Sequence, residues 1–130
     1  MSRWRWLDRQ ALLLLHEESL AEHGGAPGLR DQGLLDSALA RPRNLLAYGA
    51  PDLAELAAAY GVGLAKNHAF VDGNKRAAFL AVGLFVLVNG QRLEATQIEA
   101  TMTMLGVAAG DVEEAAFAAW IRAHLRPRHG

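Results

Sequence analysis

The sequence contains no cysteine, and this absence removes several classes of chemistry at once. A chain without thiols forms no disulfide bonds and offers no thiolate ligands to zinc. It also has no cysteine nucleophile for covalent catalysis. Any reactive group must therefore come from histidine, carboxylate, hydroxyl, amide or cationic side chains.

A long hydrophobic run is also missing. The longest apolar stretch, residues 77–88, is shorter than the roughly 20 residues that a membrane-spanning helix needs. The N-terminus is basic, but the apolar run at 11–15 is short and lies between Asp8 and Glu17, which does not fit a signal peptide. We therefore expect a cytoplasmic protein with no membrane partner.

An excess of charge of either sign is absent as well. Thirteen basic and fourteen acidic residues give a formal net charge of −1, so no overall electrostatic attraction to nucleic acid follows, and we expect no direct nucleic-acid partner.

A length of 130 residues with 52% hydrophobic residues fits a single globular domain over residues 1–130.

Convincing strands are missing too, whereas helical patterns cover nearly the whole chain. Three residue pairs with the spacing of a capping box precede amphipathic runs: Asp52 with Glu55, Thr96 with Glu99, and Asp111 with Glu114. The only candidate for an extended segment is 91–93, after an Asn-Gly pair. The fold class that we predict is all-α.

The N-terminal half fits two further helices. The first carries Leu7, Ala11, Leu14 and Leu15 on one face and ends at Gly24-Gly25, with 16–18 on a solvated face. The second begins at Asp31 and is expected to stop near Pro42, because proline disfavours helix in the residue before it.

The segment 74–88 differs from the other helices because apolar residues occur on all its sides. A helix that is apolar all round is buried among other elements. We therefore predict a small helical bundle around a central buried helix at about 74–88.

The loop 68–76, which leads into this helix, concentrates polar chemistry. Gly73 allows close approach of the backbone, and the first-turn N–H groups of the following helix have no intrahelical partner, so they favour an anion such as phosphate. Lys75 adds a point charge, and Arg76 can bind two oxygens with its planar guanidinium.

Asp72 would repel phosphate unless a divalent cation lies between them. Magnesium characteristically binds one or two carboxylates together with substrate phosphates, so Asp72 is the candidate metal ligand. His68 is the candidate general base, because an imidazole accepts a proton from a hydroxyl near neutral pH. These groups together indicate phosphoryl or nucleotidyl transfer.

Each residue also has a structural interpretation. Asp72 could be the N-cap of the central helix, and His68 could be a core histidine with satisfied hydrogen bonds. Lys75 and Arg76 could form a solvated first turn, although the helix dipole disfavours cations there. The spacing alone does not separate a phosphate-transfer site from an anion-binding module. His23, His124 and His129 are assigned no role.

The loop reads HAFVDGNKR and resembles the signature His-x-Phe-x-(Asp/Glu)-(Gly/Ala)-Asn-(Gly/Lys)-Arg of the Fic/Doc family, with every defined position filled. Residues 24–40 and 77–90 also resemble the corresponding regions of the Doc toxins in this family. The resemblance covers most of the chain and implies the helical fold of the family.

The resemblance also implies a reaction. Family members that transfer AMP usually have glycine where this chain has Lys75, whereas Doc toxins have lysine. It therefore implies a toxin that transfers the γ-phosphate of ATP, with Mg²⁺, to a threonine of elongation factor Tu and so blocks translation in the bacterial cytoplasm. Two alternatives remain: AMP transfer to a protein hydroxyl, and a non-catalytic interaction module.

The roles implied by the resemblance follow the motif residue by residue: His68 as the base, Asp72 as the magnesium ligand, Gly73 and Asn74 as the shape of the anion site, Lys75 and Arg76 as phosphate-binding residues, and Phe70 as the anchor to the core. Lys66 is a weaker basic candidate. The sequence lacks the (Ser/Thr)-x-x-x-Glu-(Gly/Asn) motif of self-restrained family members, so the resemblance implies inhibition by a separate antitoxin of the Phd type.

Overall fold

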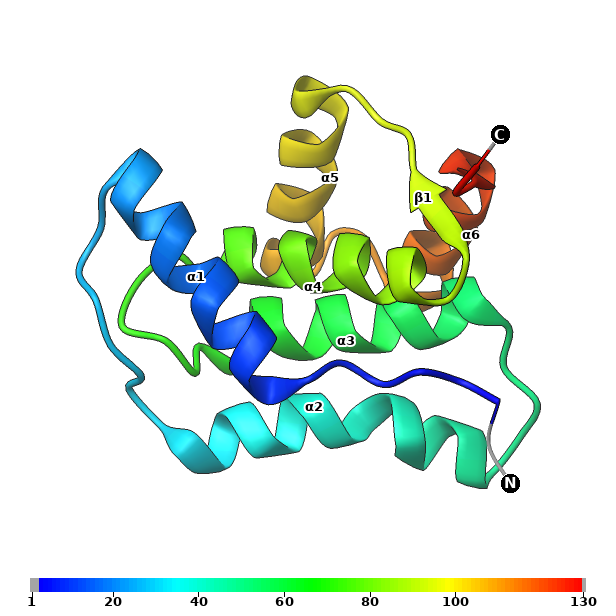
Figure 1. Cartoon of the computed structure of the whole chain (residues 1–130), viewed down its shortest axis with the longest axis horizontal. Coiled ribbons are helices and arrows are strands. Elements are labelled where there is room, and N and C mark those ends of the chain that lie inside the picture. Colours follow the sequence, from blue (N-terminus) through cyan, green and yellow to red (C-terminus); the bar gives the residue numbers. More distant parts are fainter. Residues whose placement is uncertain (1–2, 130) are drawn as a thin grey trace.

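The computed structural model describes residues 3–129, which form a helical bundle with one small pair of strands (Figure 1). The elements in chain order are α1 (Arg9–His23), α2 (Gln32–Ala47), α3 (Leu53–Asn67), α4 (Asn74–Val88), β1 (Gln91–Leu93), α5 (Gln97–Ala109), α6 (Glu114–His124) and β2 (Leu125–Pro127). This arrangement confirms the predicted all-α class. Within the described residues, no helix is both long and apolar enough to cross a bilayer.

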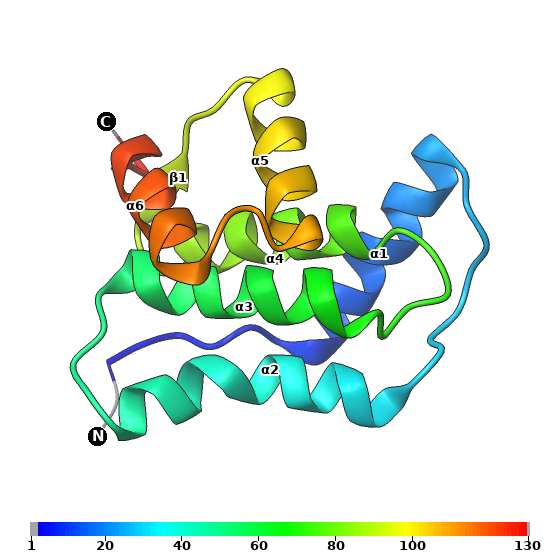
Figure 2. The same cartoon turned by 180° about the vertical axis from the view of Figure 1, so that it is seen from behind.

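Helices α3 and α4 lie side by side at the centre of the bundle, with α2 on the far side of α3 (Figures 1 and 2). The central position of α4 is as predicted, and its buried positions are 77, 78, 81, 82, 85 and 86. Helix α3 is buried more completely, because every residue from 56 to 65 is buried. By contrast, the side chain of Leu87 in α4 is 37% exposed, so α4 is not covered on all sides.

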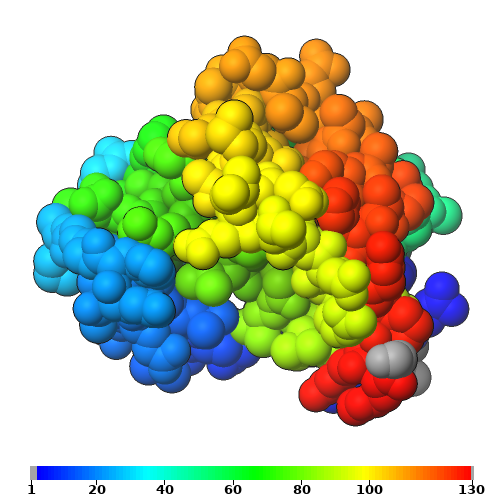
Figure 3. Space-filling view, turned by 90° about the horizontal axis from the view of Figure 1, so that it is seen from above, coloured from blue at the N-terminus to red at the C-terminus, as the bar shows by residue number. Residues whose placement is uncertain are grey.

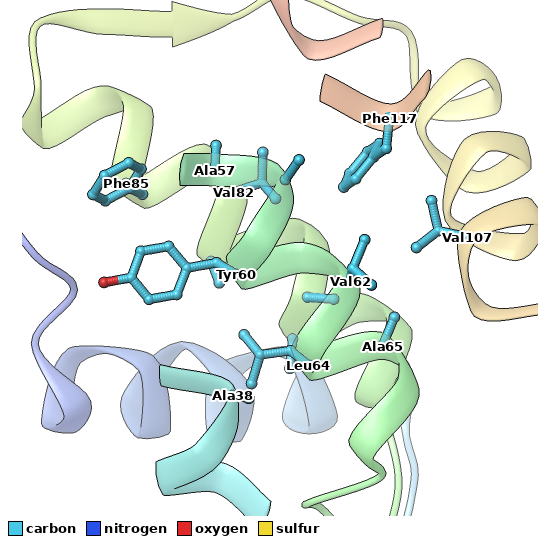
Figure 4. Packing of buried hydrophobic residues seen from close by; sticks show 14 of the residues in the cluster. Ala38, Ala57, Tyr60, Val62, Leu64, Ala65, Val82, Phe85, Val107 and Phe117 are labelled. Carbon is cyan, nitrogen blue, oxygen red and sulfur yellow. The ribbon is translucent and has the colours of Figure 1, made fainter. Parts of the chain in front are cut away.

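The core consists of side chains that converge on α3 from the surrounding helices (Figure 4). Phe85 of α4 packs against Tyr60 with ring centroids 5.0 Å apart, and Phe117 of α6 is fully buried. Burial raises the pKa of Tyr60, whose hydroxyl accepts a hydrogen bond from the backbone N–H of Leu7 at 3.1 Å. The N-terminal segment is thereby attached to the core.

The predicted helix starts are confirmed at three places and wrong at a fourth. Asp31 and Thr96 cap α2 and α5, and Asp52 forms a complete capping box with Glu55. Of the expected box at Thr96, only the bond from the N–H of Glu99 to the Thr96 hydroxyl forms, and the Glu99 carboxylate lies 3.1 Å from Nε2 of His124. The expected box at Asp111 does not form, because α6 begins at Glu114 and its N-cap has no side-chain hydrogen bond.

The reason lies at the end of α5. Gly110 adopts a left-handed conformation with φ +84°, and the N–H groups of Asp111 and Val112 donate to the carbonyl of Gly106. Asp111 therefore belongs to the turn that closes α5.

The prediction that the second helix stops near Pro42 is also wrong. Helix α2 continues through Pro42 to Ala47. Pro42 is buried, and α2 packs along α3. Tertiary packing therefore outweighs the local cost of an internal proline.

Helix α1 turns a different face to the core from the expected one. Its buried residues are Leu12, His16, Ser19 and Leu20, whereas Leu14 is 58% exposed. The leucine run 12–15 is apolar on every side of the helix and does not define a face by itself. His16 was expected on a solvated face, and the structure corrects this assignment.

The extended segment 91–93 is confirmed as strand β1. It pairs antiparallel with β2, with Arg92 opposite Arg126. The partner strand at the C-terminal end was not predicted, because three residues carry too little pattern to indicate a strand.

Candidate active site

The loop 68–76 leaves α3 through a left-handed turn at His68. This residue has φ +53° and ψ +47°, and it is the one non-glycine residue with positive φ among residues 3–129. The left-handed region is unfavourable for most side chains, although histidine is one of those enriched there. Such a conformation persists only where the surroundings impose it.

Arg30 supplies part of that support. Its Nε donates to the carbonyl of His68 at 2.8 Å, and its Nη2 donates to the carbonyl of Asn67 at 3.4 Å. Carbonyls at the end of a helix lack intrahelical donors, and a cation there also complements the helix dipole. The backbone of His68 is thus held by Arg30, whereas its exposed imidazole forms no hydrogen bond within the described residues.

The segment before α2 runs along the loop and binds it through the backbone. The N–H of Val71 donates to Gly28 O at 3.0 Å, and the N–H groups of Arg30 and Asp31 both donate to Ala69 O. This pairing joins residues 28–31 directly to the loop.

Asn74 closes the loop from within. Its Oδ1 accepts the N–H of Phe70 and its Nδ2 donates to the carbonyl of Phe70, both at 3.0 Å. The predicted role of Asn74 in shaping the anion site fits this geometry. Phe70 itself is 2% exposed, in agreement with its predicted role as the anchor of the loop.

Asp72 projects an exposed carboxylate at the entrance to α4. Its Oδ1 accepts the N–H of Gly73 at 2.9 Å, and its Oδ2 accepts the N–H of Ala26 at 3.3 Å. The N-cap of α4 is Gly73, with no side-chain cap, so the interpretation of Asp72 as that N-cap is wrong. The first-turn N–H groups of α4 thus receive no carboxylate cap.

Lys75 and Arg76 lie in this first turn and are exposed. Neither cation takes part in an ion pair within the described residues. Two unpaired cations and a row of free N–H donors at one helix end make an electropositive site.

The predicted residues converge on one cleft of about 800 Å³. Its first wall is the loop, and its second wall is α5 with the segment before it. The lining residues are His23, His68, Val71, Asp72, Gly73, Asn74, Lys75, Arg76, Phe79, Ala95, Thr96, Gln97, Ala100, Thr101, Met104 and Leu105. In Figure 3, the yellow atoms of α5 stand beside the green atoms around the loop and the blue atoms of α1.

Two basic residues differ from expectation. Lys66, the weaker candidate, is not among the lining residues. Its Nζ points instead to the end of α5, where a Cβ atom built on Gly110 would lie 3.8 Å from it. His23, which was assigned no role, lines the cleft from the end of α1.

The metal-binding capacity of the cleft is limited to few protein ligands. Within residues 3–129, no group of three or more histidine, aspartate and glutamate side chains is arranged to hold a metal ion. A cation at Asp72 would therefore complete its coordination with oxygens from a ligand and from water, which is the usual mode of Mg²⁺.

The sequence model of the Fic/DOC family matches residues 6–86, which is more than half of the chain. The match includes α1, the pairing segment and the whole loop. The chain belongs to the Fic/DOC family. The second wall of the cleft, α5, lies outside the matched range.

Two curated relatives are similar over longer stretches. "Toxin Doc" of Mycolicibacterium smegmatis is 44% identical over 93 residues, which cover 69% of this chain and 68% of the relative. "Protein kinase doc" of Escherichia phage P1 is 32% identical over 119 residues, which cover 91% of this chain and 94% of the relative. The predicted resemblance to the Doc toxins of the Fic/DOC family is confirmed.

One residue at the loop of this Fic/DOC protein was missed. His16 is 3% exposed, and its Nε2 lies 2.8 Å from the carbonyl oxygen of Asp72. The available signal was its spacing of four residues from both Leu12 and Leu20, which places all three on one helical face.

Proposed function

We propose that the protein is a toxin that transfers the γ-phosphate of ATP to a threonine hydroxyl of elongation factor Tu and thereby stops translation in the bacterial cytoplasm. The observation that carries this proposal is the convergence of His68, Asp72 and the cationic first turn of α4 on one cleft. The phage P1 relative is named a protein kinase, which supports transfer of a phosphoryl group rather than of AMP.

His68 is the proposed general base. Its imidazole lines the cleft while Arg30 holds its carbonyl, so the ring is free to accept the proton of an incoming hydroxyl. The contact with Arg30 uses only the backbone of His68, so both ring nitrogens stay available for proton transfer.

Gly73, Asn74, Lys75 and Arg76 are the proposed nucleotide-binding residues. The N–H groups of the first turn of α4 and the two cations can bind phosphate oxygens and stabilise the charge of the transferred group. Asn74 contributes by holding the loop closed, since both ends of its amide bind the backbone of Phe70.

Asp72 is the proposed ligand for Mg²⁺. Its carboxylate is exposed in the cleft beside the cationic turn, and a single carboxylate with phosphate oxygens and water fits the coordination habits of Mg²⁺. When bound, the ion would neutralise phosphate charge.

The alternatives differ at single features. AMP transfer to a protein hydroxyl is disfavoured by Lys75, which stands where AMP-transferring relatives in the family usually have glycine. A non-catalytic interaction module is disfavoured by the complete set of His68, Asp72, Asn74 and Arg76 in one cleft.

We also propose that inhibition comes from a Phd-type antitoxin that presents an apolar helical face. Beside the cleft, α5 exposes Ile98, Met102 and Leu105, at 77%, 64% and 47%, on one helical side. Exposed apolar residues at this spacing suit helix-in-groove recognition.

Mass spectrometry of elongation factor Tu after incubation with the protein, ATP and Mg²⁺ tests the proposal. We expect a mass increase of one phosphoryl group on a threonine. An adenylyl increase would establish the AMP alternative instead. Toxicity that persists in a double variant with His68→Ala and Asp72→Ala would favour the interaction module and contradict the kinase proposal.

A further inference from the structure

We propose that His16 of α1 is a positioning residue for the loop, because it fixes the peptide group that follows Asp72. The effect on catalysis rests on the proposed function, whereas the effect on the loop does not. His16 does not line the cleft and touches no substrate position there. It acts through the backbone of the residue that carries the proposed metal ligand.

The hydrogen bond has a defined direction. Nε2 of His16 lies 2.8 Å from the carbonyl oxygen of Asp72, and a carbonyl only accepts, so Nε2 must carry the hydrogen and donate it. The bond links α1 to the loop across 56 residues of sequence.

The surroundings of His16 shield this bond from water and pack the ring against an aromatic neighbour. The imidazole is 3% exposed and stacks on the ring of Phe70, with centroids 3.8 Å apart and an angle of 19° between the planes. Hydrogen bonds that are shielded from water are electrostatically stronger than exposed ones. Phe70 is itself fixed through Asn74, so the imidazole lies between two parts of one loop.

Asp72 is held at both ends as a result. Its carbonyl binds His16, and its carboxylate binds the N–H groups of Gly73 and Ala26. A peptide plane and a carboxylate that are both fixed leave the side chain little freedom. The carboxylate is therefore directed at the entrance to α4 before any ligand binds.

Gly73 provides independent evidence for close packing at this point. It has φ +74°, and a Cβ atom built on it would lie 3.4 Å from Nε2 of His16 and 3.3 Å from Cδ2 of Leu20. The left-handed backbone and the buried face of α1 thus both favour glycine at this position. Helix α1 is packed against the loop and supports it along two consecutive residues.

Two variants distinguish the effect of the hydrogen bond from the effect of the aromatic ring. His16→Phe keeps an aromatic ring against Phe70 and removes the donor. His16→Gln keeps an N–H donor at a similar reach and removes the ring. The first should lose the bond to Asp72, and the second should retain it.

Hydrogen–deuterium exchange of the full-length protein measures the loop directly. We expect exchange in peptides covering 68–76 to accelerate about tenfold in His16→Phe and much less in His16→Gln, with peptides of α3 unchanged. Unchanged loop exchange in His16→Phe, or equal acceleration in both variants, would overturn the proposal.

Kinetics add a second readout. For phosphoryl transfer, kcat should fall about tenfold to a hundredfold in His16→Phe while KM for the protein substrate stays constant, and His16→Gln should recover most of the loss. If the wild type transfers no phosphate but loop exchange still accelerates in His16→Phe, the proposed function fails and the positioning role of His16 stands.

A measurement on the wild type does not depend on the folding of any variant. The ¹⁵N chemical shifts of the His16 ring report which nitrogen carries hydrogen. A protonated Nε2 is expected, and a bare Nε2 would rule out the bond to Asp72.

Discussion

The two walls of the cleft are built in different ways. The loop wall is bound by α1 through His16, by the segment before α2 through Arg30, and by its own Asn74. The α5 wall has buried residues on one side, yet it exposes Met102 and its apolar neighbours on another. The groups proposed for phosphoryl transfer thus lie on a wall that several hydrogen bonds hold in place. Ile98 and Met102, which belong to the proposed antitoxin surface, lie on the part of α5 that does not line the cleft.

The largest expected effect comes from removing the proposed base on the loop wall. His68→Asn removes the imidazole but keeps a residue type that tolerates the left-handed conformation. We expect phosphoryl transfer to fall by about a hundredfold or more with unchanged thermal stability, because general-base catalysis typically contributes about 10² to 10⁴. Steady-state kinetics and thermal unfolding check this. Near-normal transfer would mean that the loop wall does not hold the base.

A smaller effect is expected where the loop wall meets its support. At Gly25, a Cβ atom would lie 2.9 Å from Leu20 and 3.1 Å from the carboxylate of Asp72. Gly25→Ala should therefore displace this carboxylate and lower transfer about tenfold, since displacements of about 1 Å can cost even more.

The neighbouring Gly24 offers a matched control. It also has a positive φ, but a Cβ atom there would meet nothing within 4 Å. Gly24 has φ +82° and ψ +174°, so Gly24→Ala should lose stability through backbone strain, by about 1–3 kcal/mol, without affecting transfer. If both variants lose the same activity, backbone strain alone explains the losses, and displacement of the Asp72 carboxylate does not.

On the α5 wall, Met102→Ser should leave transfer unchanged. Met102 is 64% exposed, and exposed substitutions usually alter stability by less than about 0.5 kcal/mol. Binding of the proposed antitoxin should weaken about tenfold, which calorimetric titration measures. If Met102→Ser instead lowers phosphoryl transfer and leaves antitoxin binding unaltered, Met102 serves the reaction and not the recognition of the antitoxin.

The smallest effect on the cleft is expected at the opposite end of α3. Hydrogen bonding to Arg122 lowers the pKa of Asp52 below its usual range. A lowered folded-state pKa stabilises the protein above the unfolded-state pKa, and this contribution is lost as the pH falls through the folded-state value. Asp52→Asn should therefore lower the unfolding temperature near neutral pH but not in strong acid, with transfer unaffected. An equal deficit at both pH values would contradict this linkage.

Sequence patterns predicted the parts of this molecule whose signals are local. The loop residues from His68 to Arg76 are contiguous, so their meeting in one cleft follows from the chain itself. The capping box at Asp52 was readable because its partners are three residues apart. Among the features that were missed, the turn at Asp111 is local, whereas the burial of His16 and strand β2 depend on distant partners.

His16 and β2 show this limit in physical terms. The polarity of His16 suggested solvent, but its hydrogen bond to Asp72 and its stacking on Phe70 make burial favourable. Strand β2 acquires its conformation from β1, which lies more than thirty positions earlier in the chain. Neither partner is visible in a local window of sequence.

The span of the contact between His16 and Asp72 has a consequence for how the protein reaches its active form. Helices form from local contacts, whereas closing a loop of 56 residues costs chain entropy that later contacts must offset. During folding, α3 and α4 should therefore pair before α1 attaches to the loop. A newly made chain would then pass through a stage in which the helical core is formed but the loop lacks its support from α1. The proposed phosphoryl transfer would begin only after α1 has docked.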